Sequence, residues 1–117
     1  MDKQEFCVTC DYTIKEVMQV FERNKERGVV VQGEEGKVCG FLSMGDIIYA
    51  LVDGKNMYSR IGQICNRSFI YLQETDYKKA LEIFKKRNIS LIPIVNEELH
   101  LIDVITARDL FEMVELK

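Results

Sequence analysis

Two short stretches of this chain pair a hydroxyl with a carboxylate at a fixed spacing. Ser43 is followed three residues later by Asp46, and Thr106 is followed three residues later by Asp109. A hydroxyl directly after an apolar run, with an acidic residue three positions on, is typical of a helix N-terminus, and such a capping box needs no ligand to explain it. A carboxylate there can also accept hydrogen bonds from two adjacent hydroxyls, as in a ribose, and the free N–H groups of a helix N-terminus suit a phosphate. These two stretches are therefore the first candidates for a binding site.

The pairing occurs twice because the chain contains an internal repeat. Asp109 follows Asp46 by 63 residues, and Thr106 follows Ser43 by the same interval. The apolar pattern matches at this shift over nearly the whole unit, and identical pairs include Lys15/Lys78, Phe21/Phe84, Glu34/Glu97, Glu35/Glu98 and Asp46/Asp109. Since each repeat is too small for a sizeable core of its own, we expect the two to pack face to face with approximate two-fold symmetry.

The first repeat is predicted to alternate strands with amphipathic helices. Thr13 and Glu16 have a capping-box pattern, and the helix that they begin is predicted to end near Lys25, with Gly28 after it at positive φ. A hairpin and a second helix complete the unit. The predicted elements are a strand over residues 5–10, a helix over 14–25, strands over 29–32 and 37–42, and a helix over 44–52 with Ile47, Ile48, Leu51 and Val52 on its apolar side.

The second repeat restates this order, so the predicted fold class is α+β, with two β-α-β-β-α repeats of α/β type. Its elements are a strand over 69–72, a helix with Tyr77, Ala80, Leu81 and Phe84 on its apolar side, strands over 91–95 and 100–105, and a helix after Thr106. The predicted domains are residues 1–54 and 69–117, joined by a polar connector over 55–68 that contains a helical turn. The Phe and Met side chains are expected in the core.

Composition and charge limit the class of protein. The chain has 117 residues, of which 47% are hydrophobic and 30% charged, as in an ordinary globular domain. Its net charge of −3 argues against a nucleic-acid partner, which usually requires a basic face. Residues 1–5 are polar and no long apolar run follows, so neither a signal peptide nor a membrane span is predicted. The expected location is cytoplasmic, where the four cysteines stay reduced.

Two further features invite a chemical interpretation. Cys7 and Cys10 have the spacing of a redox or zinc motif, yet they lie on a predicted strand, their side chains point to opposite faces, and no second pair completes a zinc site. His100, the only histidine, has no Cys or Ser near it in sequence. We therefore expect structural thiols, no metal site and no catalytic residues.

The order of these elements and motifs resembles a known family. Gly40-x-x-Ser43-x-x-Asp46, x-x-x-Thr106-x-x-Asp109 and Leu91-Ile92-Pro93-Ile94-Val95 are similar to the motifs of a tandem pair of cystathionine β-synthase (CBS) domains, the Bateman module. The resemblance covers about residues 6–116. It implies a non-enzymatic regulatory module that binds an adenine nucleotide (AMP, ADP or ATP) or a related adenosyl ligand between the repeats, controls a partner enzyme or transporter domain, and forms a homodimer.

The candidate ligand contacts follow from the chemistry of the residues together with this resemblance. Asp46 and Asp109 would accept hydrogen bonds from ribose hydroxyls. Ser43 and Thr106 would hold phosphate at the two helix N-termini, with Arg108 as a further phosphate ligand. The contacts that the resemblance implies are an adenine slot at Val29 and Val30 in one repeat and at Ile92 and Pro93 in the other, and the hydroxyl of Thr13.

The second repeat departs from the family pattern at two positions, and the two candidate sites differ at a third. Asp103 stands where the first repeat has Gly40. In having an aspartate at this position, the chain resembles the CBS pairs that are attached to sugar-phosphate nucleotidyltransferases. Asp76, at the start of a helix, would repel a phosphate. Arg108 has Gly45 as its counterpart. The two sites are therefore expected to be chemically unequal.

Two other functions remain as alternatives. One is a structural dimerisation module whose capping boxes only cap helices. The other, less favoured, is a thiol redox or metal-binding protein that uses Cys7 and Cys10. The chain is equally compatible with a standalone protein and with a domain cut from a longer one.

Overall fold

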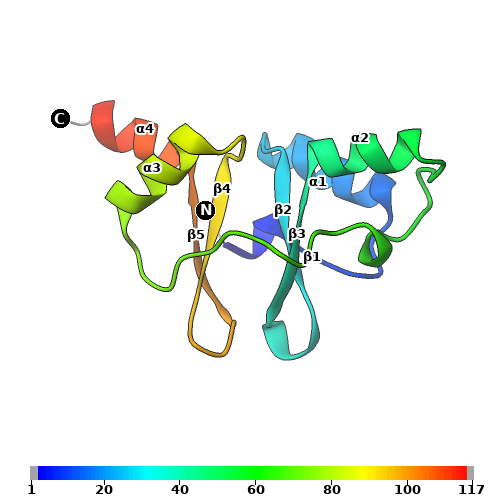
Figure 1. Ribbon diagram of the computed structural model, residues 1–117, viewed down its shortest axis with the longest axis horizontal. Helices are drawn as coiled ribbons and strands as arrows, with labels where there is room; N and C mark the ends of the chain where they lie inside the picture. The colour runs from blue at the N-terminus through cyan, green and yellow to red at the C-terminus, as the bar shows by residue number, and fades with distance from the viewer. Residues whose placement is uncertain (1–2, 116–117) are drawn as a thin grey trace.

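The structure is a computed structural model that describes residues 3–115, and it contains the predicted alternation of strands and helices (Figure 1). The first repeat contains β1 (Cys7–Thr9), α1 (Ile14–Asn24), β2 (Gly28–Gln32), β3 (Val38–Ser43) and α2 (Met44–Val52). The second contains α3 (Tyr77–Lys86), β4 (Leu91–Val95), β5 (Leu101–Thr106) and α4 (Ala107–Glu115). Short 3-10 turns lie at Lys3–Phe6, Glu34–Gly36 and Ile61–Gln63. The predicted fold class is confirmed, and the helical turn in the connector is present.

The strands form one small sheet in each repeat. In the first sheet β2 is central, parallel to β1 and antiparallel to β3, so that Val30 lies opposite both Cys7 and Phe41. In the second sheet β4 pairs antiparallel with β5, and Ile92 lies opposite Ile105. Both predicted hairpins are therefore confirmed.

The predicted entry strand of the second repeat, residues 69–72, is wrong except for its last residue. Leu72 makes an isolated parallel bridge to Ile94, donating from its N–H to the Pro93 carbonyl at 3.0 Å and accepting from the Val95 N–H at 2.8 Å. The next rung of a parallel ladder would need the N–H of residue 93 to donate to the carbonyl of Ile70. Proline has no N–H, so the ladder stops after one residue.

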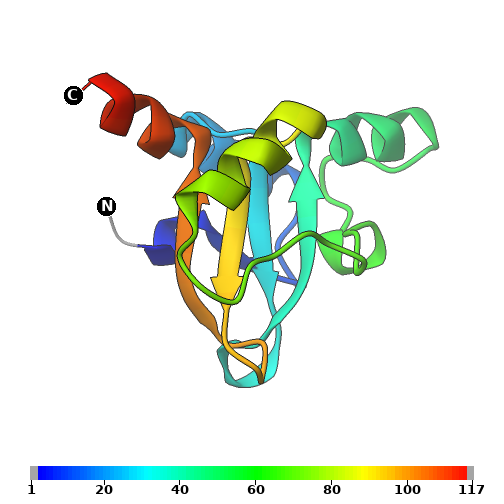
Figure 2. The ribbon, with the colours of Figure 1, turned by 60° about the vertical axis from the view of Figure 1, so that its left-hand side comes forward.

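A shared hydrophobic core joins the two repeats, as the repeat pattern predicted. Figure 2 shows the two sheets side by side, with β2 next to β4. The core between them takes side chains from both repeats: Phe6, Val30, Val38, Leu91, Val95, Leu101 and Val104. The hairpins also meet at their tips, where the Val38 N–H donates to the Leu99 carbonyl at 2.8 Å. Within residues 3–115, every helix is too short or too polar to span a bilayer.

The end of α1 differs from the prediction. The positive φ falls on Lys25, at 58°, and the helix ends at Asn24. Gly28 instead lies inside β2, where a Cβ atom would stand 2.5 Å from Cζ of Phe41. Gly28 is therefore needed to leave room for the Phe41 ring of β3. It takes no part in ending α1.

Several apolar side chains expected in the interior lie at the surface. On α2, Ile47 and Ala50 are buried, but Ile48 and Val52 are 56% and 84% exposed. On α3 only Ala80 is fully buried, because the second sheet is one strand narrower and gives the helix less surface to cover. The prediction that the Phe and Met side chains lie in the core is wrong for Phe111 and Met113, which are exposed on α4. Tyr77 and Leu81 of the predicted apolar side of α3 are also exposed, as is Tyr49 on α2.

Candidate functional site

Both predicted capping boxes form, with closely similar geometry. The Thr106 N–H donates to Oδ2 of Asp109 at 2.9 Å, and the Asp109 N–H donates to Oγ1 of Thr106 at 3.1 Å. The Ser43 N–H donates to Oδ2 of Asp46 at 2.9 Å, and the Asp46 N–H donates to Oγ of Ser43 at 3.1 Å. Each carboxylate is thus fixed at the start of its helix while keeping lone pairs for further hydrogen bonds.

A cavity of about 480 Å³ opens at the N-terminus of α4 and includes the second capping box. Its volume lies in the range of small-ligand sites. It is lined by Lys3, Phe6, Glu26, Tyr77, Asp103, Val104, Ile105, Thr106, Arg108, Asp109, Glu112 and Met113. The wall therefore combines residues of the second repeat with Lys3, Phe6 and Glu26 from the first.

The corresponding region of the first repeat is much smaller. A cavity of about 190 Å³ is lined there by Phe41, Asn66, Ser68, Phe69, Ile70, Arg87, Ile89 and Leu91. Among these lining residues there is neither Ser43 nor Asp46. The connector fills the space, because the Phe41 N–H donates to the Asn66 carbonyl at 2.9 Å. Gly40 permits this approach, since a Cβ atom there would lie 3.1 Å from that carbonyl oxygen. The structure thus places Asp109 on the wall of the larger of these two cavities and Asp46 on the wall of neither.

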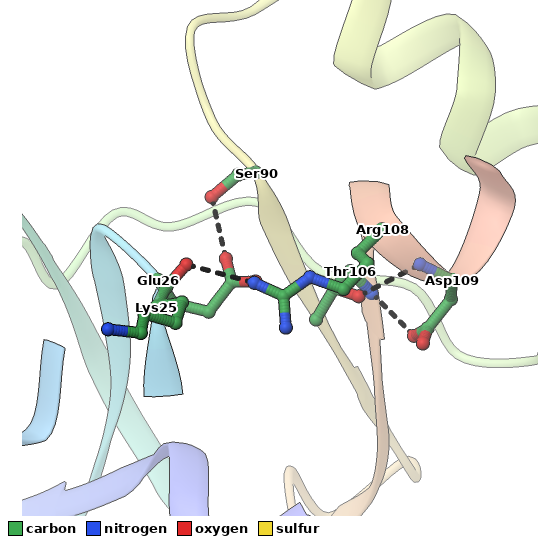
Figure 3. A network of polar contacts seen from close by, with 6 residues as sticks. All are labelled: Lys25, Glu26, Ser90, Thr106, Arg108 and Asp109. Atoms are coloured by element: carbon green, nitrogen blue, oxygen red, sulfur yellow. Dashed lines mark hydrogen bonds and ion pairs between the residues drawn. The ribbon is translucent and has the colours of Figure 1, made fainter. Parts of the chain in front are cut away.

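A polar network crosses from one repeat to the other at the edge of the larger cavity (Figure 3). The Glu26 side chain lies just before β2 and is only 8% exposed. Its Oε1 accepts a hydrogen bond from the Ser90 hydroxyl at 2.9 Å, and its Oε2 lies 3.8 Å from Nη2 of Arg108. Nη2 of Arg108 also donates to the Lys25 carbonyl at 3.1 Å. Both Ser90 and Arg108 belong to the second repeat, so Glu26 ties the repeats together.

Burial raises the pKa of the Glu26 carboxyl above its usual 4.5, although the Ser90 hydroxyl and the Arg108 guanidinium both favour the charged form. A carboxyl with a raised pKa stabilises the fold while it is protonated. This contribution is fully present below pH 4.5 and is lost as the pH rises through the raised pKa.

Glu26→Gln is therefore expected to remove one component of the pH dependence of stability. The glutamine keeps the shape and the acceptor for Ser90 but cannot ionise. The free energy of unfolding of the wild type, minus that of the variant, should fall as the pH rises from 4.5 towards neutrality and then level off. Urea unfolding at pH values from 4 to 8 measures this difference. A difference that stays constant over the range would show that Glu26 titrates as it does in the unfolded chain.

A third cavity, of about 540 Å³, lies between the N-termini of α2 and α4 and shares Glu26 and Arg108 with the first. It is lined by Lys25, Glu26, Arg27, Gly28, Phe41, Ser43, Met44, Gly45, Ile48, Asn88, Ile89, Ser90, Ala107 and Arg108. Three basic side chains face one carboxylate here. This cavity therefore carries positive charge, whereas the walls of the first hold four carboxylates and two basic groups.

The remaining predicted contacts are not brought to these cavities. Val29, Val30, Ile92 and Pro93 are buried in the strands, where at least the first three pack in the hydrophobic core. The Thr13 hydroxyl caps α1, accepting from the Glu16 N–H at 3.2 Å. Asp76 likewise caps α3, accepting from the Lys79 N–H at 3.0 Å. An adenine contact by these strands would have to use backbone groups.

Glu26 and Ser90 are site residues that the sequence reasoning did not identify. A weak signal was present: at the 63-residue shift Glu26 corresponds to Ile89, so a charged residue stands two positions before a buried strand where the other repeat has an apolar one. Asp103, which departs from the family pattern, lines the cavity of about 480 Å³, and its Oδ1 accepts from the Val104 N–H at 2.8 Å.

The cysteines are distributed between two regions. Cys7 packs against the core between the repeats, and Cys10 packs against the core of the first repeat, where its Sγ lies 4.0 Å from Sγ of Cys39. Burial raises the pKa of Cys39 and of Cys65, which favours the protonated thiol. Among residues 3–115 no group of three His, Cys, Asp or Glu side chains could hold a metal ion.

Comparison with known proteins gives relatives that share this architecture. The chain is 31% identical over 114 residues to MJ1225 of Methanocaldococcus jannaschii, covering 83% of this chain and 41% of the relative. The MJ1225 crystal structure, described as a putative archaeal homolog of γ-AMPK, has a TM-score of 0.76 at 28% identity, covering 92% of this chain and 45% of that one.

Two other relatives have solved structures with ligands. The chain is 25% identical over 109 residues to the magnesium transporter MgtE of Thermus thermophilus, covering 88% of this chain and 23% of MgtE. The MgtE cytosolic domain in complex with ATP has a TM-score of 0.73 at 23% identity, with coverage of 97% and 46%. The CBS domain pair of MJ0100, in complex with 5′-methylthioadenosine and S-adenosylmethionine, has a TM-score of 0.75 at 21% identity, with coverage of 94% and 87%.

The chain spans less than half the length of MJ1225 and of MgtE. The family model of the CBS domain matches residues 1–53 and again residues 61–115. The first match contains β1 to α2, and the second contains α3 to α4 together with the end of the connector. The chain therefore belongs to the CBS domain family and carries two CBS domains in tandem.

Proposed function

We propose that this CBS pair is a regulatory module that binds an adenosyl ligand in the cavity at the N-terminus of α4. The observation that carries this proposal is the position of Asp109: a carboxylate fixed by the Thr106 N–H stands on the wall of a cavity of about 480 Å³. Such a carboxylate can accept hydrogen bonds from both hydroxyls of a ribose. The α4 N-terminus adds a partial positive charge beside it.

The relatives support an adenosyl ligand, since MgtE was solved with ATP and the MJ0100 pair with two adenosyl compounds. AMP, ADP and ATP are the nucleotides first to be tested. In this proposal Thr106 and Arg108 face the tail of the ligand, and Ser43 faces it from the neighbouring cavity. The predicted adenine contacts with Ile92 and Pro93 are not part of this proposal, because neither residue lines the cavity.

The proposed mechanism is a population shift and not catalysis. Ser90 and Arg108 from one repeat meet Glu26 from the other at the edge of the cavity, so a ligand there contacts both repeats. A ligand that binds one relative arrangement of the repeats more tightly shifts the equilibrium towards it. The repeats are assigned to residues 1–54 and 69–117, with 55–68 as the connector. Residues 1–2 and 116–117 lie outside the part of the chain that the structure describes. In this proposal the partner that the module regulates is an enzyme or transporter domain in the cytoplasm.

The test is a thermal-shift panel of AMP, ADP, ATP, 5′-methylthioadenosine and S-adenosylmethionine on three proteins: wild type, Asp109→Asn and Asp46→Asn. At a ligand concentration of 100 times Kd, the wild type should gain about 2.7 kcal/mol in the free energy of unfolding. Asparagine keeps the acceptor for the Thr106 N–H but cannot accept from both ribose hydroxyls, so Asp109→Asn should weaken binding about 30-fold. Asp46→Asn is the matched control and should leave binding nearly unchanged.

Two results would contradict this proposal. Loss of binding in Asp46→Asn alone would move the ligand to the first repeat. The absence of any shift at millimolar concentration would favour the alternative, a structural module whose capping boxes only cap helices.

We further propose that two copies of the chain form a homodimer through α2 and α4. Ile48 and Phe111 occupy equivalent places in the two repeats, and their side chains are 56% and 64% exposed. Val52 and Met113 extend the two apolar faces, at 84% and 42% exposed. Two such faces related by an internal two-fold axis suit a second copy, which presents the same pair.

A further inference from the structure

A buried carboxylate on the cavity wall, Glu26, enters the function proposed above only as a contact between the repeats. Glu26 lines both cavities and is 8% exposed, and its partners are the Ser90 hydroxyl and the Arg108 guanidinium. The Glu26 carboxylate is paired with Arg108, so it competes with any other anion for that guanidinium. Its position between the two cavities therefore has to affect any ligand that reaches Arg108.

The charges on the two sides of Glu26 have opposite signs. In the cavity that holds Asp109, the lining carboxylates are Glu26, Asp103, Asp109 and Glu112, and the basic groups are Lys3 and Arg108. In the neighbouring cavity, Lys25, Arg27 and Arg108 face Glu26. Among these lining residues, Arg108 is the basic group that both cavities share. A phosphate that extends from a nucleoside in the first cavity towards the second would thus lie beside Arg108.

Arg108 is already engaged at that point. Its Nη2 lies 3.8 Å from Oε2 of Glu26 and donates to the Lys25 carbonyl at 3.1 Å. A phosphate bound to the guanidinium would stand beside the Glu26 carboxylate, and two negative charges at such a distance repel each other strongly where water is partly excluded. A phosphate on Arg108 is therefore disfavoured while the Glu26 carboxylate stays charged and in place, whereas a ligand without phosphate is not.

Building on the proposed adenosyl site, we propose that Glu26 competes with the ligand's phosphate for Arg108 and so sets the preference of the site for adenosyl ligands without phosphate over phosphorylated ones. The competing carboxylate belongs to the first repeat and the guanidinium to the second. Displacement of Glu26 by a phosphate also removes a contact between the repeats. The contact between Glu26 and Arg108 would consequently be broken by a phosphorylated ligand and kept with a phosphate-free one.

The test compares AMP with adenosine, which differ only in the phosphate, on the wild type and on Glu26→Gln. Isothermal titration at fixed pH and ionic strength gives both Kd values. Glutamine keeps the size of the side chain and an acceptor for Ser90 but removes the charge. The ratio of AMP affinity to adenosine affinity should rise about tenfold in Glu26→Gln, since one close like charge is gone. An unchanged ratio would overturn the proposal.

Glu112→Gln is the matched control, because Glu112 is an exposed carboxylate on the same cavity wall. It removes the same charge without touching the pair with Arg108, and the ratio should change less than twofold. An equal rise in Glu112→Gln would mean that the net charge of the cavity, and not Glu26, discriminates. That result would also overturn the proposal.

Inorganic pyrophosphate separates this inference from the proposed function, because it contains no adenosine. It should bind Glu26→Gln about tenfold more tightly than wild type, and the gain should vanish when Arg108→Met is added. If neither adenosine nor AMP bound any variant, the proposal of an adenosyl site would be wrong. The pyrophosphate titration would still decide whether Glu26 competes with a phosphate for Arg108. Equal pyrophosphate binding by wild type and Glu26→Gln would refute it.

Discussion

Leu91→Ala is expected to lower the free energy of unfolding by about 3 kcal/mol. Leu91 begins β4, is 1% exposed, and packs in the core between the repeats together with Val30 and Val38 of the first repeat. Truncation leaves a cavity where the two sheets meet, and neither sheet can close it without losing its own pairing. For a chain of this size, 3 kcal/mol is a large part of the total stability. Urea unfolding followed by circular dichroism measures the loss.

Leu81→Ala provides the control for this prediction. Leu81 is on α3 and is 45% exposed, so the same truncation should cost less than about 1 kcal/mol. Equal losses at the two positions would mean that the core between the repeats is no better packed than the helix surface. The two repeats would then be joined mainly by hydrogen bonds such as that between Ser90 and Glu26.

The variant Ile48→Lys/Phe111→Lys is expected to be monomeric where the wild type is a dimer. The two side chains are equivalent in the two repeats and are 56% and 64% exposed, so a charge on each places four lysines in the proposed interface. Unpaired charges buried at the centre of an interface cost several kcal/mol in total, enough to raise a micromolar Kd beyond the millimolar range. Sedimentation velocity should give a single species at the chain mass of 13.6 kDa.

Tyr58→Lys is the comparison for the dimer. Tyr58 is 73% exposed, but it lies in the connector and outside α2 and α4. This variant should sediment like the wild type. A wild type that is itself monomeric at 100 µM would contradict the proposed homodimer, and dissociation by Tyr58→Lys alone would place the interface on the connector.

The elements of the fold that depend on neighbouring residues were predictable. The capping boxes join atoms only three residues apart, so residue type and spacing alone specified Ser43 with Asp46 and Thr106 with Asp109. The two hairpins followed from apolar runs separated by short polar turns. Internal repetition then predicted the pairing of two equivalent units, and the core between the sheets confirms it.

The errors in the predicted fold arise where a residue contacts another that is distant in the sequence. The entry strand of the second repeat failed because Pro93, more than twenty residues away, lacks the N–H that the ladder requires. Gly28 was assigned to a helix end, whereas its function is to leave room for Phe41 across the sheet. The sequence of α2 could not show which of its apolar residues are exposed, since a surface that binds a partner is apolar in the same way as a surface that faces the core.

The sequence by itself determined that this chain is a repeat with two capped helix N-termini, each carrying a carboxylate that suits a diol. The tertiary structure decided that Asp109 lines the cavity of the second repeat, whereas the first capping box reaches the neighbouring cavity through Ser43. Asn66 and Gly40 close the space in the first repeat, while Glu26, 64 residues before Ser90, reaches the cavity of the second. These contacts depend on how two folded units pack, which no spacing along the chain encodes, because packing brings together residues that local structure leaves apart.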